Sequence, residues 1–259
     1  MKTRTMLNML AKRFPKKYAK AYHDHVGLMT GKLPLEVNKI LLCLDLDEEL
    51  FETVKKVHPD IVISHHPFIF GTRAKVFKYD PLKKDLCERI DALGIPVYSF
   101  HTNFDAGRGG MNDALTSALS LENVYTPLKD ISMRIGTLPN PMNIDEFVRY
   151  ALHTFNIDYG QLISNGNKNI SKVGIIGGGG SRSWNIAMEE GCDIYISGDA
   201  PHHVRRDIVN AKFNYLDVPH EVEKIFMPTM KKILLEMDPS LEIIEIDHEK
   251  LPTLVQINA

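Results

Sequence analysis

The apolar positions of the chain alternate between two spacings. Three nearly continuous apolar runs have the length of strands, and the segments between and after them carry apolar residues at helical spacing. The runs are residues 40–46, 61–64 and 95–100, and the helical segments are 48–57, 81–93 and 111–119. Near-continuous apolar strands separated by helices are typical of a parallel sheet covered on both faces. The first half of the chain is therefore predicted to be α/β.

The periodicity weakens after Leu121 and then returns in a similar form. Strands are predicted at 133–138, 173–176, 193–197 and 213–217, with helices after Asn143 and over 182–190. The run 194–197 (IYIS) resembles the run 61–64 (IVIS), and each leads into a polar loop with a histidine pair. We predict two α/β units of related topology, with mainly parallel sheets covered by helices.

Metal-competent side chains follow three of the predicted strands. Two adjacent histidines, His65 and His66, come after the run 61–64, and His101 and Asp105 come after the run 95–100. A third group, 220–223 (HEVE), follows the strand at 213–217. Ligands of parallel sheets gather at the carboxyl ends of the strands, so these groups are expected to share one edge. Adjacent imidazoles on an extended strand point apart, so His65 and His66 need a turn to serve one ion, or each serves a different ion.

The first 25 residues leave several interpretations open. Residues 5–22 place apolar side chains at helical spacing, with an interruption near Pro15 and basic residues on the other sides. We interpret this segment as a docked amphipathic helix; the alternatives are a basic face for phosphate and an organellar transit peptide. His23 and His25 are either solvated loop residues or further metal ligands.

The glycine run 177–180 lies between a predicted strand and a predicted helix. No Lys-Ser or Lys-Thr follows at the Walker spacing, and no GxGxxG with a supporting acid is present, so a dedicated P-loop is not expected. The glycines are expected to allow close backbone packing or the approach of a substrate phosphate. Asp199, His202 and His203 follow the next strand, where they either line a cleft or cap a helix.

Composition limits the class of protein. Lys and Arg total 31 and Asp and Glu total 33, which leaves a net charge of −2 and makes nucleic acid an unlikely partner. Cys43, Cys87 and Cys192 are widely spaced and form no CxxC, as is typical of thiols in a reducing compartment, so we expect a cytoplasmic location. No apolar run approaches the length of about 18 residues needed to cross a membrane.

Several motifs together resemble those of one known family. They are Ser64–Pro67 (SHHP), His101–Asp113 (HTNFDAGRGGMND), Arg134–Gly136, the Gly-Gly-Ser turn, Ile196–Asp199 and the late His-Glu pair. In this order they resemble the GTP cyclohydrolase I type 2 homologue family, also called the NIF-three-like family. The resemblance covers nearly the whole chain and implies two α/β domains, a toroidal homohexamer and two divalent ions in the cleft between the domains. We place the first domain at residues 1–126, completed by 218–259, and the second at 127–217.

The resemblance implies that the metal ligands are His65, His66, Asp105, His220 and a glutamate. The family usually has this glutamate four residues after the late histidine, but position 224 of this chain is lysine. Glu221 and Glu223 are the available acids. Residues i and i+3 of a helix share a face, so Glu223 can replace the family acid beside His220.

Imidazole and carboxylate ligands without thiolate suit Zn, Mn, Fe, Co or Ni and do not select among them. Hydrolysis is the expected reaction, and the family name implies a nucleotide-like substrate, GTP or a related purine or phosphate compound. His101, on the same loop as Asp105, is the candidate acid–base or orienting residue; the alternative is that it only caps a turn. Two other classes of function stay open: a metal-stabilised hexameric scaffold that binds protein or nucleic acid, and a nucleotide sensor.

Overall fold

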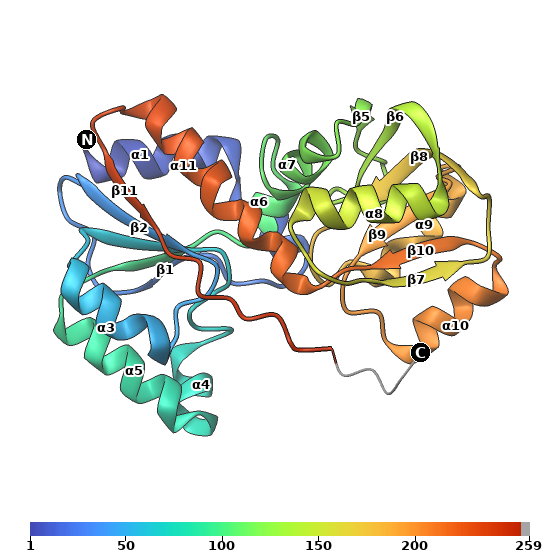
Figure 1. Cartoon of the computed structure of the whole chain (residues 1–259). Coiled ribbons are helices and arrows are strands. Elements are labelled where there is room, and N and C mark those ends of the chain that lie inside the picture. The colour runs from blue at the N-terminus through green and yellow to red at the C-terminus, as the bar shows by residue number, and fades with distance from the viewer. Residues whose placement is uncertain (255–259) are drawn as a thin grey trace.

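The structure is a computed structural model and describes residues 1–254. Its first sheet has five strands in the order β1-β4-β3-β2-β11 (Figure 1). They are β1 (Gly27–Thr30), β2 (Lys39–Cys43), β3 (Ile61–Ser64), β4 (Val97–Ser99) and β11 (Glu242–Glu245). β4, β3, β2 and β11 run parallel, and the edge strand β1 is antiparallel to β4. The chain thus returns at its C-terminal end to complete the sheet begun near its N-terminus.

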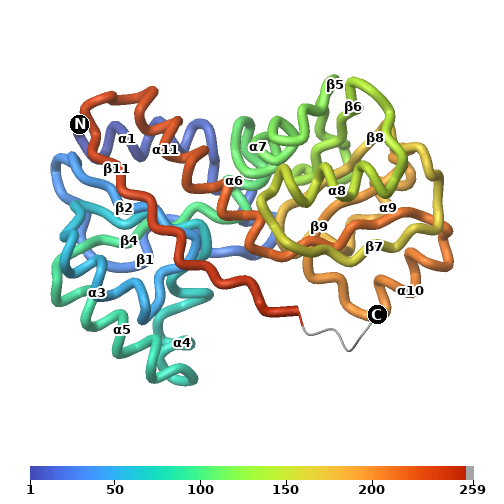
Figure 2. The backbone as a smooth tube through the Cα atoms, viewed as in Figure 1, coloured from blue at the N-terminus to red at the C-terminus, as the bar shows by residue number. Residues whose placement is uncertain are grey.

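Helices cover both faces of this sheet, as the continuous apolar runs predicted (Figures 1 and 2). Alternate residues of β2 point to opposite faces. Ile40 and Leu42 pack in the core that contains α1 (Thr3–Arg13) and α11 (Phe226–Met237). Leu41 and Cys43 pack in the core that contains α3 (Glu48–Val57) and α5 (Pro81–Ala92). The short helices α2 (Lys16–Ala21), α4 (Arg73–Tyr79), α6 (Thr102–Ala106) and α7 (Met111–Ala118) complete this half.

The second sheet has six strands in the order β5-β6-β8-β9-β10-β7. They are β5 (Glu122–Tyr125), β6 (Arg134–Asn143), β7 (Gln161–Ser164), β8 (Asn169–Ile175), β9 (Ile194–Ser197) and β10 (Asn214–Asp217). α8 (Ile144–Phe155) covers one face, and α9 (Trp184–Glu189) and α10 (His202–Asn210) pack in the core on the other. The short 3₁₀ helix η1 (Ser181–Ser183) leads into α9.

The second sheet is more mixed than the sequence suggested. β8, β9 and β10 run parallel, but β6 and β7 flank them in antiparallel orientation and β5 pairs antiparallel with β6. β5 is exposed along its whole length and β7 is at best half-buried. Such edge strands lack the continuous apolar run of a central strand, so the hydrophobic pattern did not reveal them.

The two sheets share part of their hydrophobic core. One cluster of buried side chains contains Ile40 and Ile63 of the first sheet together with Val173 and Ile196 of the second. The loops after β3, β4, β8, β9 and β10 then meet between the sheets, which places the carboxyl ends of five parallel strands around one site. None of the helices within residues 1–254 is long and apolar enough to cross a membrane.

Candidate metal centre

Three imidazole nitrogens converge on one carboxylate oxygen between the sheets. The Oε2 atom of Glu223 lies 2.9 Å from Nε2 of His66, 3.1 Å from Nε2 of His220 and 3.3 Å from Nε2 of His65. His65 and His66 follow β3, whereas His220 and Glu223 belong to the 3₁₀ helix η2 (His220–Ile225), which follows β10. Residues at the ends of strands in different sheets therefore form one cluster.

Each histidine of the cluster is held by a hydrogen bond from its Nδ1 atom. The acceptors are the carbonyl oxygen of Phe100 for His65 (2.8 Å), Asp45 for His66 (2.6 Å), Asp24 for His101 (2.8 Å) and Asp199 for His220 (2.5 Å). Because these oxygens only accept, each Nδ1 carries the proton and each Nε2 is left with its lone pair when the ring is neutral. Oxygen acceptors that orient histidines in this way are typical of metal sites.

Two buried polar atoms of the cluster have no hydrogen-bond partner within residues 1–254. They are Nε2 of His65, whose side chain is completely buried, and Oδ1 of Asp105, 3.6 Å away. A buried polar atom without a partner costs free energy, so such atoms call for an explanation. A divalent ion would supply both with a partner, and the nitrogen and oxygen donors are chemically suited to one.

Three overlapping groups of side chains have ligand atoms within 4.8 Å of one another. They are His65-His66-His101, His66-His220-Glu223 and His65-Asp105-Glu223. All five residues proposed from the family resemblance thus lie together, and His101 lies with them. These buried His, Asp and Glu groups could bind metal ions.

Burial and charge shift the pKa values of the cluster strongly. Burial lowers the pKa of His65 to about 4, so this ring is neutral near pH 7. Burial opposes protonation of His66 and His220 as well, but hydrogen bonds and charge from neighbouring carboxylates raise their pKa values to about 10 and about 9. Because metal ligands must be deprotonated, binding of an ion would displace these protons.

The two buried carboxylates respond in opposite ways. Burial raises the pKa of Asp105 to about 8, and the nearby charge of Glu223 adds to this effect. Burial would also raise the pKa of Glu223, but the surrounding histidines outweigh it and hold that pKa well below its usual range. Glu223 is therefore the anionic centre of the cluster.

The sequence interpretation missed two of the carboxylates that hold these rings. Asp24 lies between His23 and His25, which were weighed as ligands; both histidines are exposed, and Asp24 instead bonds His101. Asp45, which bonds His66, stands two residues after β2. Its place just beyond a strand is the only signal in the sequence, and such a signal does not show which histidine the acid holds.

The glycine run packs against the cluster. Gly178 has φ +63°, and a Cβ atom there would overlap the carboxylate of Glu223 and lie 3.0 Å from Nε2 of His220. Close backbone approach, one of the two roles expected from the sequence, is thus realised toward these side chains. His202 and His203 are exposed at the start of α10 and do not line the cavity, whereas Asp199 bonds His220.

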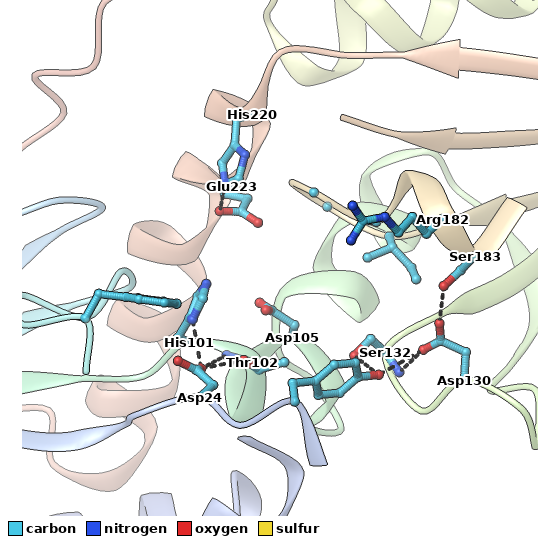
Figure 3. A pocket seen from close by; sticks show the side chains of 16 residues that line it. Asp24, His101, Thr102, Asp105, Asp130, Ser132, Arg182, Ser183, His220 and Glu223 are labelled. Atoms are coloured by element: carbon cyan, nitrogen blue, oxygen red, sulfur yellow. Dashed lines mark hydrogen bonds and ion pairs between the residues drawn. The ribbon is translucent and has the colours of Figure 1, made fainter. Parts of the chain in front are cut away.

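A cavity of about 430 Å³ opens beside the cluster (Figure 3). His101, Asp105, His220 and Glu223 form one wall, and Gly177, Gly179, Gly180, Arg182 and Ser183 come from the second sheet. Its volume lies within the range of about 300–1,000 Å³ that is usual for small-molecule sites. The fold and the cluster define a two-sheet α/β protein with a candidate multi-histidine metal centre beside a ligand-sized cavity.

The chain belongs to the Duf34/NIF3 (NGG1p interacting factor 3) family, whose model matches residues 1–252. This confirms the family resemblance seen in the sequence. The GTP cyclohydrolase 1 type 2 homolog of Lactococcus lactis is 28% identical and aligns with 88% of this chain and 90% of its own length. The homolog of the same name from Clostridium perfringens is 26% identical over 97% of this chain and 98% of its own length.

The fold is also similar to that of solved structures. The crystal structure of a Bacillus cereus protein related to NIF3 has a TM-score of 0.86, with 19% sequence identity and 99% coverage of both chains. This likeness confirms the α/β fold with two sheets and helices.

Proposed function

We propose that this protein is a metal-dependent hydrolase that holds two divalent ions through His65, His66, Asp105, His220 and Glu223. The observation that carries the proposal is the convergence of three imidazole Nε2 atoms on Oε2 of Glu223, with every Nδ1 held from behind. Hydrogen bonds of this kind fix the orientation of a histidine ring and are typical of histidines that bind metal.

The division of the cluster supports two ions. The groups His66-His220-Glu223 and His65-Asp105-Glu223 have only Glu223 in common. A carboxylate has two oxygens and can bind an ion through each, so Glu223 would bridge the two sites. The absence of cysteine from all three groups is consistent with Zn, Mn, Fe, Co or Ni.

The surroundings of His101 fit a further ligand as well as the acid–base or orienting residue proposed from the sequence. It shares a group with His65 and His66, and Asp24 holds its Nδ1 as Asp45 holds that of His66. A ring whose Nδ1 is held by a carboxylate can also gain and lose a proton at Nε2, and His101 lines the cavity, so the acid–base role is proposed beside the ligand role.

When bound, paired divalent ions lower the pKa of water and stabilise negative charge that develops on a substrate oxygen. The residues that would hold the ions lie at the floor of the cavity. His65, Asp105 and Glu223 are buried there, which limits their contact with water. The name of the Lactococcus and Clostridium relatives supports a nucleotide or related purine or phosphate compound as substrate.

Two further properties are proposed with the reaction. A ring-shaped homohexamer is supported by the exposed edge strand β5 and by the fully exposed Leu128 beside it, which leave apolar surface for a second copy. A cytoplasmic location is supported by Cys43, Cys87 and Cys192, which are buried and unpaired.

The first test is elemental analysis of the purified protein and of His66→Ala. The variant should lose roughly half or more of its bound metal and keep its fold, because His66 contributes to the cluster and not to the hydrophobic core. His203→Ala, which removes an exposed histidine on α10, is the matched control and should keep the wild-type metal content. Equal metal content in both variants would refute the assignment.

A screen of nucleotides in the preferred metal then tests the reaction. Consumption of a nucleotide by the wild type and not by His66→Ala supports the hydrolase. Full metal occupancy without turnover would support a metal-stabilised scaffold, and nucleotide binding without turnover a sensor.

A further inference from the structure

The cavity beside the cluster has one strongly basic side chain. Among its lining residues Arg182 is the sole Lys or Arg, and no carboxylate within residues 1–254 lies within 4.0 Å of its guanidinium. Figure 3 shows this guanidinium pointing into the cavity, on the side opposite His101. A guanidinium offers five N–H donors in a planar fork that matches the oxygens of a phosphate or carboxylate.

The carboxylate on the same side of the cavity is already engaged. Asp130 accepts hydrogen bonds from the hydroxyls of Ser183 (2.6 Å) and Tyr22 (3.2 Å) and from the amide of Ser132 (2.9 Å). These donors fix its two oxygens away from Arg182, as Figure 3 shows. The charge of Arg182 is thus left facing the cavity.

The backbone next to Arg182 offers a further donor. Gly179 lines the cavity, and within residues 1–254 its amide N–H donates to no acceptor. A Cβ atom at Gly179 would meet nothing closer than Asp199 Oδ2 at 3.6 Å, so this part of the wall is open. A guanidinium and a free amide on one wall are a suitable pair of donors for a phosphate group.

An aromatic ring stands at the other side of the same cavity. Phe70 is 68% exposed and lines the cavity, and its ring lies edge-on to His101 with the centroids 6.5 Å apart. An exposed phenyl ring at the rim of a cavity provides an apolar face on which a flat ring can stack, and base–aromatic stacking tolerates any base.

We propose that Arg182 and Phe70 position the nucleotide-like substrate, Arg182 at its phosphate and Phe70 at its planar heterocycle. Arg182 and the amide of Gly179 hold the phosphate, Phe70 stacks on the heterocycle, and the part of the molecule between them lies over His101, Asp105 and Glu223. This inference deepens the proposed function and rests on it for the identity of the reacting site, but the binding itself requires no turnover.

The test measures equilibrium binding of GMP and of guanosine to the metal-loaded full-length protein by calorimetry. Arg182→Gln should weaken GMP binding about tenfold or more and leave guanosine binding unchanged, because only GMP carries the phosphate. Arg206→Gln, which removes an exposed arginine of α10 outside the cavity, is the matched control. Phe70→Ala should weaken both ligands by a similar factor of about ten, and Tyr79→Ala, at a comparably exposed ring outside this cavity, should weaken neither.

Two results would overturn the proposal: guanosine binding as tightly as GMP to the wild type, or Arg182→Gln binding GMP as the wild type does. Metal content measured in the same samples separates this outcome from failure of the proposed function. If the protein binds no metal but Arg182→Gln still weakens GMP binding, the metal centre is refuted and the phosphate site stands. If the protein binds its full metal and Arg182→Gln has no effect on GMP binding, the phosphate site is refuted and the metal centre stands.

Discussion

Glu223 reaches the cluster because the segment that carries it is a 3₁₀ helix. Such a helix has three residues per turn, so side chains at i and i+3 lie directly above one another. His220 and Glu223 therefore share one face, with Nε2 and Oε2 3.1 Å apart. Lys224, at the position where the family resemblance implies the acid, instead lies 4.0 Å from Asp247. The acid of this chain is one residue nearer the histidine than the family resemblance implies, and the 3₁₀ helix still places the two side chains on one face.

The charge of Glu223 is predicted to be essential for metal binding. Glu223→Gln keeps the shape of the side chain but removes the negative charge that would balance the two proposed cations, so metal content should fall by about one ion per chain or more. Glu221→Gln is the control. Glu221 lies near Tyr159 and belongs to none of the three candidate groups, so this variant should retain its metal. Elemental analysis of both variants decides the point; equal retention would show that another residue closes the site.

The candidate ligands that could be predicted from the sequence are metal-competent residues that directly follow a predicted strand. His65, His66, Asp105 and His220 met both conditions, and the family resemblance added Glu223. Asp24 and Asp45 could not be assigned in this way, because a single acid in a loop is common and its partner histidine stands 77 or 21 residues away. Only the folded chain determines which acid holds which ring.

The turn between β8 and η1 is the element on which the cluster depends most closely. Gly178 adopts a left-handed backbone conformation there, and its Cα faces the carboxylate of Glu223. The same turn is anchored by a hydrogen bond from the amide of Gly177 to Asn112 of α7 (2.8 Å). The turn therefore shapes the cluster although none of its own residues belongs to the three candidate groups.

Gly178→Ala is predicted to lower both stability and metal content. The left-handed conformation costs a residue with a Cβ atom about 1–2 kcal/mol, and the new methyl group would force the Glu223 carboxylate away from the histidines. Gly179→Ala is the matched control, since its Cβ atom would make only an ordinary contact at 3.6 Å. Urea unfolding and elemental analysis measure the two effects. Wild-type values of both for Gly178→Ala would contradict the close approach that the turn provides.

At the level of elements, the hydrophobic pattern predicted the buried strands well and the edge strands poorly. The predicted helix at 48–57 and the strand at 61–64 coincide with α3 and β3, and the interruption near Pro15 separates α1 from α2. β1 and β11 at the edges of the first sheet were missed, and so were β5 and β7 at the edges of the second, because an edge strand lacks the continuous apolar run of a central strand. The antiparallel flanks of the second sheet depend on β5 and β7 and could not be inferred without them.

The whole molecule is predicted to associate with copies of itself. The exposed strand β5, with Val124 and Tyr125, and the neighbouring Leu128 form an apolar edge that a second copy could cover. Light scattering at micromolar concentration should give a mass of about six times 29.4 kDa. Leu128→Lys should shift the mass toward smaller species, and Leu82→Lys, at another largely exposed leucine, on α5, serves as the control. A monomeric mass for the wild type would refute the ring.

The return of the chain to its first sheet has a consequence for biosynthesis. β2 leaves the ribosome long before its neighbour β11, and His220 and Glu223 follow His66 by more than 150 residues. Synthesis proceeds at about 5–20 residues per second, and segments that have left the ribosome can begin to fold before it is complete. During that time the edge of β2 is unpaired, and His65 and His66 have no carboxylate from η2. The candidate metal centre is thus completed only after η2 has been made, so a truncated chain that ends at β10 has the first two histidines but lacks His220 and Glu223.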